Sequence, residues 1–108
     1  MEKIKALFLD RDGVINYDPG YVYRIEDFEF MPGIFEALAG FMALGYEIFI
    51  VTNQSGIGRG YYSQDDFAKL SEYMIDRFAA YGVKIGQIYH CPHIPSDNCN
   101  CRKPKPGM

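Results

Sequence analysis

Three apolar runs alternate with two helical patterns, and this order restricts the fold more than any other feature of the sequence. The runs cover residues 5–10, 46–51 and 85–90, and the third is the weakest. Their apolar residues do not alternate with polar ones, which is typical of strands buried on both faces of a sheet. The order strand, helix, strand, helix, strand therefore predicts an α/β fold whose parallel strands are joined by right-handed crossovers.

Between the runs, apolar residues recur at helical spacing. The first helix is predicted to begin near Pro32, which suits a first turn, and to stop at Gly45. The second is predicted to begin at Ser63, because Ser63 and Asp66 have the spacing of a capping box, and to stop at Gly82. In open α/β sheets ligands bind outside the carboxyl ends of the strands. Since polar segments follow all three runs, we expect them to meet at one edge.

Composition excludes several function classes for a chain that we interpret as one domain over residues 1–108. A hydrophobic content of 48% argues against disorder, and a net charge of −3 without a basic run gives no reason to expect nucleic acid or an anionic membrane as partner. No apolar stretch approaches a bilayer span, and the N-terminus does not resemble a signal peptide, so we expect a cytosolic protein.

Two carboxylates, Asp10 and Asp12, end the first apolar run and are followed by Gly13. The glycine permits a turn that brings both side chains to one phosphorus centre. One carboxylate could attack phosphorus while the other protonates the leaving oxygen and then activates water. Two anions beside a phosphate need a cation, and Mg²⁺ is the usual choice. A polar turn without catalytic function is the alternative that the spacing alone leaves open.

The second apolar run is followed by a hydroxyl, two amides and a glycine in residues 52–56. Successive backbone N–H groups in such a segment form a nest for an anion, and a solvated loop is the alternative. Further along, Arg59 either reaches a second anionic group of the substrate or is simply solvated.

The third run leads into all three cysteines of the chain. Cys91 and His93 are followed, after five residues, by Cys99 and Cys101. Three thiolates and one imidazole complete a tetrahedral, structural Zn²⁺ site, so we predict a zinc loop over residues 91–101, with buried or free thiols as the alternative. The cysteines are too few and too close together for a disulfide framework.

The octet LDRDGVIN at positions 9–16 resembles the first motif of the haloacid dehalogenase superfamily of phosphatases. The resemblance implies a Rossmann-like, three-layer α/β/α fold with a parallel sheet, of which this chain would form the N-terminal part. It implies that Asp10 is the nucleophile and ligates Mg²⁺ by its side chain, and that Asp12 is the acid/base and ligates Mg²⁺ by its backbone carbonyl. Thr52 matches the second motif, which holds the phosphoryl group. Lys103 matches the third motif, which offsets the negative charge of that phosphoryl group.

Within the superfamily, a zinc loop of this kind is similar to that of heptose 1,7-bisphosphate phosphatases and histidinol-phosphate phosphatases. The segments 18–22, 27–30, 52–60 and 102–108 resemble the heptose branch, whereas the short spacer 94–98 is closer to the histidinol branch. We therefore expect removal of the 7-phosphate of a heptose 1,7-bisphosphate, with histidinol phosphate as the alternative. The residues expected to contact the substrate are Arg11, Asp18, Pro19, Gly20, Tyr21, Asn53, Gln54, Ser55, Arg59 and Arg102.

Members of the superfamily carry a fourth, acidic motif beyond the lysine motif, and the chain ends at Met108 before one occurs. We interpret the sequence as part of a longer, monomeric enzyme whose partner is a small phosphorylated metabolite. By itself the 108-residue chain would lack part of the Mg²⁺ shell. A truncated relative, or a zinc-stabilised module that binds sugar phosphates without cleaving them, is the alternative.

Overall fold

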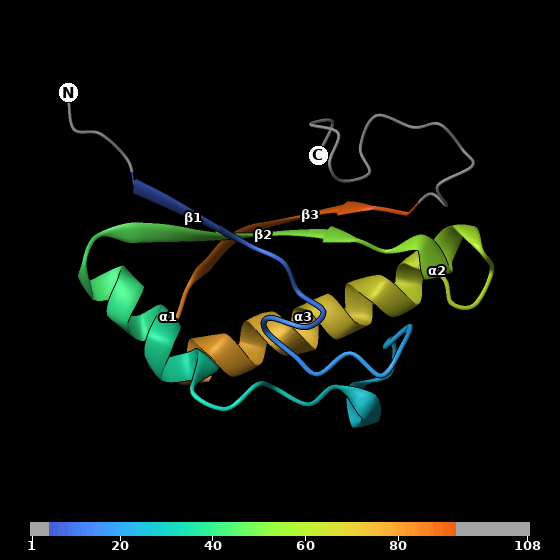
Figure 1. The fold of residues 1–108 in the computed structure, drawn as a ribbon, viewed down its shortest axis with the longest axis horizontal. Coiled ribbons are helices and arrows are strands. Elements are labelled where there is room, and N and C mark those ends of the chain that lie inside the picture. Colours follow the sequence, from blue (N-terminus) through green and yellow to red (C-terminus); the bar gives the residue numbers. More distant parts are fainter. Residues whose placement is uncertain (1–4, 93–108) are drawn as a thin grey trace.

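The computed structural model describes residues 5–92, which form a parallel sheet with helices packed against it (Figure 1). Its elements are β1 (Lys5–Leu9), the 3-10 helix η1 (Ile25–Asp27), α1 (Ile34–Ala43), β2 (Tyr46–Asn53), α2 (Ser55–Gly58), α3 (Gln64–Ala80) and β3 (Ile85–Cys91). Five residues with a predicted role lie outside the described part of the chain: His93, Cys99, Cys101, Arg102 and Lys103.

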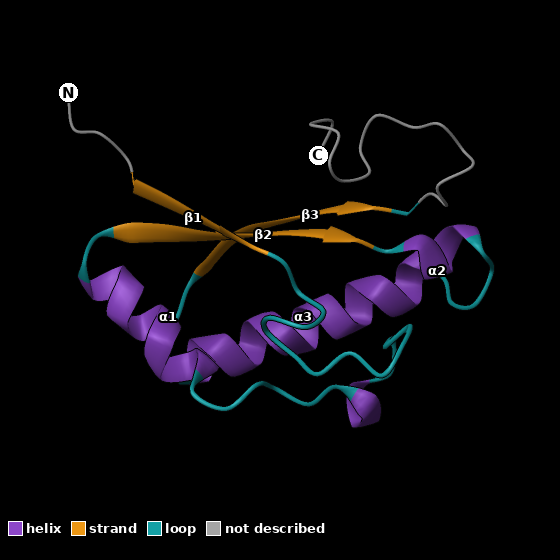
Figure 2. Ribbon diagram, viewed as in Figure 1, coloured by secondary structure: helices purple, strands orange, loops and turns teal. Residues whose placement is uncertain are grey.

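The sheet has the order β1-β2-β3, and both strand pairs are parallel, as the sequence predicted. Because neighbouring strands follow chain order, two right-handed crossovers place both connecting helices on the same face. Figure 2 shows α1 and α3 together on one side of the sheet. Within the described part of the chain there are accordingly two layers, and a third layer is not seen there.

The open face of the sheet differs from the expectation of strands buried on both sides. Along β2, Ile48, Ile50 and Thr52 face the helices and are buried, while Phe49 is only half-buried. Phe8 of β1 is 61% exposed and stacks on Phe49 with ring centroids 5.3 Å apart. The apolar runs therefore predicted the strands correctly, but among residues 5–92 no helix covers this second face.

The helix boundaries follow from local signals. Ser63 caps α3 in a reciprocal capping box: its Oγ accepts from the Asp66 N–H at 3.0 Å, and its own N–H donates to Asp66 Oδ2 at 3.0 Å. This confirms the predicted start. Gly45 and Gly82 follow the ends of α1 and α3 with φ of 91° and 78°, a backbone region that glycine adopts without penalty. The single-turn helix α2, inside the polar segment after β2, was not predicted.

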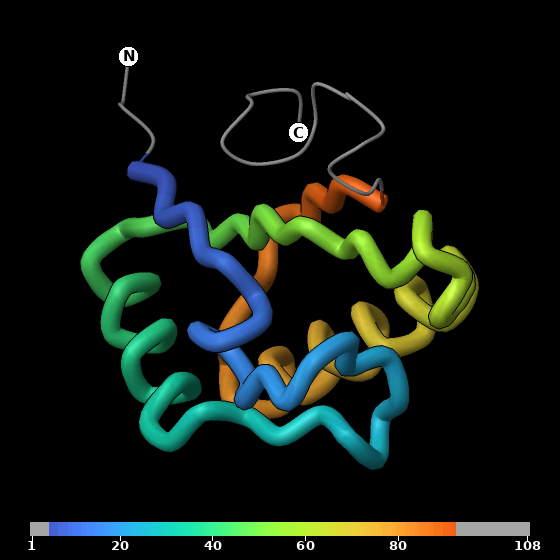
Figure 3. The backbone as a smooth tube through the Cα atoms, turned by 45° about the vertical axis from the view of Figure 1, so that its right-hand side comes forward, coloured from blue at the N-terminus to red at the C-terminus, as the bar shows by residue number. Residues whose placement is uncertain are grey.

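The long segment between β1 and α1 folds back beneath the sheet, alongside α3 (Figures 1 and 3). Backbone bonds hold it: the Met31 N–H donates to the Ile15 carbonyl at 2.8 Å, and the Tyr17 N–H donates to the Glu29 carbonyl at 2.9 Å. The segment contributes Ile15, Val22 and Phe28 to the same core as the buried residues of the sheet and helices. The position of this segment therefore determines the surroundings of the side chains that follow β1.

Candidate active site

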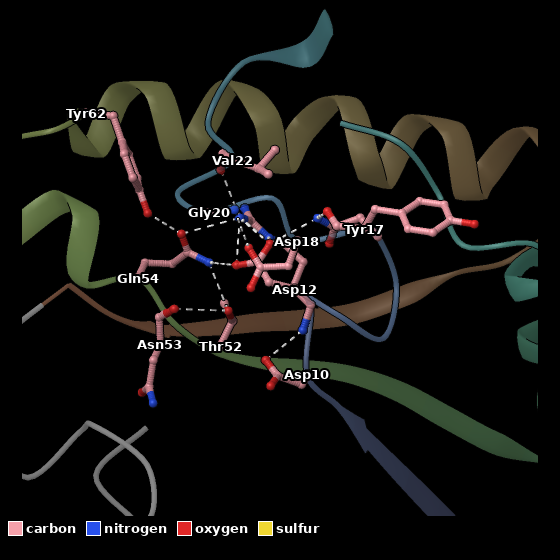
Figure 4. Close-up of polar contacts among 12 residues, drawn as sticks. Asp10, Asp12, Tyr17, Asp18, Gly20, Val22, Thr52, Asn53, Gln54 and Tyr62 are labelled. Carbon is pink, nitrogen blue, oxygen red and sulfur yellow. Dashed lines mark hydrogen bonds and ion pairs between the residues drawn. The ribbon is translucent and has the colours of Figure 1, made fainter. Parts of the chain in front are cut away.

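The ends of the strands lie together, as the parallel topology predicted. Asp10 directly follows β1, and Thr52 is the last residue but one of β2 (Figure 4). The end of β3 is tied to the segment after β2, since the Gln54 N–H donates to the Cys91 carbonyl at 2.7 Å and the Gly58 N–H donates to the Pro92 carbonyl at 2.8 Å. The polar residues of the first two strand ends thus share one edge of the sheet.

Asp10 presents its carboxylate to solvent at this edge. Its Oδ1 accepts the backbone N–H of Arg11 at 2.9 Å, which fixes the side-chain direction. Gly13, with φ of 88°, donates its N–H to the Asn16 carbonyl at 2.8 Å and closes the predicted turn. A carboxylate that is exposed and oriented at the edge of the sheet is chemically able to attack an approaching phosphorus.

Asp12 turns the other way, and its two oxygens are filled by protein donors. Oδ1 accepts from Arg11 Nε and from Asn16 Nδ2, each at 3.0 Å. Oδ2 accepts from Arg11 Nη2 at 3.1 Å and from Gln54 Nε2 at 3.0 Å. A carboxylate offers about four lone-pair sites, so these four bonds occupy its accepting capacity.

Arg11 is a buried cation, with 1% of its surface exposed. Its fork pairs with Asp12, and Nη2 also donates to the Val22 carbonyl at 3.0 Å. The guanidinium lies 5.8 Å from the ring centroid of Phe28 and 5.9 Å from that of Phe67. The sequence predicted that Arg11 contacts substrate, but in this structure its guanidinium faces the interior and has no surface for such a contact.

Gln54 is also buried, at 2% exposure, and links Asp12 to the loop after β2. Its Nε2 donates to Asp12 Oδ2 and to Thr52 Oγ1, at 3.0 and 2.9 Å. Its Oε1 accepts the hydroxyl of Tyr62 and, at 3.4 Å, Arg11 Nη2. Like Arg11, Gln54 was expected to contact substrate, and the structure instead surrounds it with protein.

Arg11, Asp12, Gln54 and Tyr62 form one hydrogen-bonded cluster, and Tyr62 is the member that was not predicted from the sequence. Burial, followed by smaller charge effects, raises the pKa of Tyr62 to about 12, so its hydroxyl keeps its proton and remains a donor at neutral pH. Its ring stacks on Tyr23 with centroids 5.2 Å apart. A tyrosine following a glycine-rich loop carries no sequence signal that distinguishes this position from a surface aromatic.

The other expected substrate contacts lie around the same edge with differing exposure. Thr52 is 1% exposed, and its Oγ1 accepts from Gln54. The exposed residues are Asp18, Pro19, Gly20, Tyr21 and Arg59, and the half-buried ones are Asn53 and Ser55. Asp18 Oδ1 accepts the Gly20 N–H at 3.1 Å, which shapes the loop that carries Tyr21. This loop and Arg59 are therefore available to a ligand, in contrast to Arg11 and Gln54.

The described residues offer oxygen donors that fit Mg²⁺ but no complete cage. Between residues 5 and 92, no three or more His, Cys, Asp or Glu side chains gather as a metal site. Asp10 supplies one exposed carboxylate, and Mg²⁺ is usually held by one or two carboxylates together with water and substrate phosphate. Protein donors occupy the side chain of Asp12, and its backbone carbonyl, which the resemblance implies as a Mg²⁺ ligand, is not engaged by that network.

Of the predicted zinc ligands, only Cys91 lies within the described residues. It is fully buried at the end of β3, and the other three ligands lie outside those residues, so the zinc loop stays a prediction. Among residues 5–92 no helix has the length and apolar character that crossing a bilayer requires.

No protein-family model matches the chain. It is 62% identical over 106 residues to D-glycero-alpha-D-manno-heptose-1,7-bisphosphate 7-phosphatase of Campylobacter jejuni. The aligned region covers 98% of this chain and 60% of that protein. It is 53% identical over 109 residues to the D-glycero-beta-D-manno-heptose-1,7-bisphosphate 7-phosphatase of Helicobacter pylori, covering 100% of this chain and 63% of the relative.

A solved structure agrees with these relatives. D,D-heptose 1,7-bisphosphate phosphatase from B. bronchiseptica, complexed with magnesium and phosphate, superposes with a TM-score of 0.90 and 35% identity, over 96% of this chain and 59% of that one. Of the two branches that the sequence left open, the comparisons favour the heptose branch and not the histidinol branch. The chain spans about 60% of the length of the curated relatives it matches. It is a homologue of the heptose 1,7-bisphosphate 7-phosphatases, as its resemblance to the haloacid dehalogenase superfamily predicted.

Proposed function

We propose that the protein containing this chain is a Mg²⁺-dependent phosphatase that removes the 7-phosphate of a D-glycero-D-manno-heptose 1,7-bisphosphate. The observation that carries the proposal is the arrangement at the sheet edge, where an exposed Asp10 and a protein-held Asp12 follow the same strand. The identity of 62% to an enzyme of that name supports the substrate. We also propose a cytosolic location and a monomer.

The reaction would proceed in two balanced steps. An Asp10 oxygen attacks the 7-phosphorus, the bond from phosphorus to the sugar oxygen breaks, and Asp12 gives that oxygen a proton. Water then attacks the phosphorus of the aspartyl-phosphate and loses a proton to Asp12, so that inorganic phosphate leaves and the Asp10 carboxylate is restored. Bound Mg²⁺ would offset the charge of the two anions, with Asp10 and the Asp12 carbonyl as its ligands in this chain.

The loop 18–21, Asn53, Ser55 and Arg59 are proposed to contact the sugar or its second phosphate. The loop 18–21 and Arg59 are exposed and Asn53 and Ser55 are half-buried, which supports these contacts. Thr52 is 1% exposed, and its proposed role of holding the transferring phosphoryl group rests on the resemblance alone. Arg102 and Lys103 remain proposed contacts by the resemblance alone.

The substrate is tested with the complete protein that carries this chain. We expect Mg²⁺-dependent release of one phosphate from heptose 1,7-bisphosphate, with a kcat/KM at least about 100-fold above that for histidinol phosphate, because a site that pairs polar groups of one substrate rejects another that leaves them unpaired. Phosphate release from both compounds, followed with equal enzyme and Mg²⁺, measures the ratio. A preference for histidinol phosphate would overturn the assignment.

We propose further that Cys91, His93, Cys99 and Cys101 bind one structural Zn²⁺ when the cysteines are reduced. Metal analysis of protein purified under reducing conditions should find about one zinc per chain, and Cys99→Ser should lower both the zinc content and the melting temperature. Protein that contains no zinc under these conditions, with a melting temperature that Cys99→Ser leaves unchanged, would contradict the proposal.

A further inference from the structure

We infer that Arg11, Gln54 and Tyr62 are positioning residues that hold the carboxylate of Asp12 for its proton-transfer role. The inference rests on the proposed function, since it concerns the same site. It also assigns roles that differ from those expected from sequence: Arg11 and Gln54 act on Asp12 and not on the substrate, and Tyr62 joins the site through Gln54.

The directions of the hydrogen bonds to Gln54 support these roles. Gln54 directs its amide nitrogen at Asp12 Oδ2 and Thr52 Oγ1, two acceptors, and its amide oxygen at two donors, the Tyr62 hydroxyl and Arg11 Nη2. Rotating the amide by half a turn would set its oxygen against the Asp12 carboxylate and its NH₂ against Arg11 Nη2, which can only donate. Asp12 and Arg11 therefore fix the amide orientation, and the Tyr62 hydroxyl donates to the amide oxygen and holds Gln54 in place (Figure 4).

Stability alone does not explain why a buried arginine occupies position 11. It is 1% exposed, and its Nη1 is buried without a hydrogen-bond partner among the described residues. A buried charge with an unmade hydrogen bond opposes folding, and an apolar residue of similar volume is often as stable. The remaining fork contacts fix both oxygens of Asp12, and rules of local stability are most often broken where function requires it.

The cluster connects the two strand ends that the reaction needs. Asp12 belongs to the segment after β1, and Gln54 to the segment after β2, where Thr52 accepts from the same amide group. One amide thus sets the distance between the acid/base and the proposed phosphoryl-holding residue. Because all four Asp12 bonds occupy its lone pairs, one of them must open before Asp12 can take a proton from water. The Gln54 amide is itself held by the Tyr62 hydroxyl, so Tyr62 acts on one of the four bonds.

Tyr62→Phe in the complete protein tests the inference, since it removes one hydroxyl and keeps the ring that stacks on Tyr23. We expect kcat for heptose bisphosphate to fall about tenfold, the loss of one orienting hydrogen bond, with KM changed less than twofold. An aryl phosphate such as 4-nitrophenyl phosphate has a leaving group that needs no proton. With it, only hydrolysis of the aspartyl-phosphate should slow, so the fraction of enzyme trapped as phosphoenzyme should rise above that of the parent protein.

Tyr23→Phe is the matched control, because the Tyr23 hydroxyl accepts from Arg24 at the surface, at 3.1 and 3.3 Å, and does not touch the cluster. It should leave kcat and the phosphoenzyme fraction unchanged. A second variant, Arg11→Lys, keeps the charge and loses the two-pronged contact, and should reproduce the lower kcat with unchanged KM. The inference is overturned if Tyr62→Phe raises KM alone, or lowers kcat without raising the phosphoenzyme fraction. An inactive parent protein would instead contradict the proposed function.

Discussion

Asp10→Asn is expected to reduce turnover by about 10⁴-fold or more, because an amide cannot form the aspartyl-phosphate. The substitution should not disturb the local fold. Asparagine retains Oδ1, which accepts the Arg11 N–H at 2.9 Å, and the side chain is exposed at the edge of the sheet. The loss should therefore appear in kcat, with a melting temperature close to that of the parent protein.

Phosphate release in saturating Mg²⁺ measures the loss of turnover, and mass spectrometry of acid-quenched enzyme detects the phosphoryl adduct. The adduct should be present in the parent protein and absent in the variant. Asp76→Asn is the matched control, since it makes the same exchange on the exposed side of α3 and should leave both measurements unchanged. Turnover above a tenth of the parent rate in Asp10→Asn would exclude Asp10 as the nucleophile.

Features of the fold that depend on local sequence could be predicted from it. The apolar runs gave the strands because their burial is a property of consecutive residues, and the parallel order followed from the helices between them. The start of α3 was predicted because Ser63 and Asp66 satisfy each other within one turn. What failed was the second face of the sheet: an apolar run shows that a strand prefers burial, but not which layer covers each side.

The candidate site, too, depends on tertiary contacts that the sequence does not reveal. From the sequence we predict that Arg11, between the two aspartates of a phosphatase motif, contacts the substrate. Its burial depends on Val22, eleven residues away, and on Gln54, 43 residues away, which the folded-back segment and β2 bring to it. Such contacts are set by tertiary structure. Without the position of that segment, a buried Arg11 cannot be distinguished from an exposed one.

Gly56→Ala is expected to lower both stability and kcat, through a residue that makes no polar contact with Asp12. A Cβ at Gly56 would lie 2.1 Å from Cε1 of Tyr62 and 2.9 Å from two further ring atoms. The ring cannot simply swing away, because Tyr62 is buried and stacked on Tyr23. We expect a loss of about 1–3 kcal/mol in the free energy of unfolding from overpacking. The displaced hydroxyl should also release Gln54, lowering kcat by up to about tenfold, as Tyr62→Phe does, which corresponds to about 1.4 kcal/mol.

Gly40→Ala provides the matched control, since this helical glycine of α1 has nothing within 4 Å of an added Cβ and should gain up to about 1 kcal/mol. Thermal and urea unfolding measure the stabilities, and steady-state kinetics measure kcat. The double variant Gly56→Ala/Tyr62→Phe separates the two effects. If both changes act on kcat by breaking the Tyr62–Gln54 bond, their kinetic losses cannot add, whereas the cost of overpacking remains. Additive losses in kcat would mean that Gly56 affects Asp12 by another route.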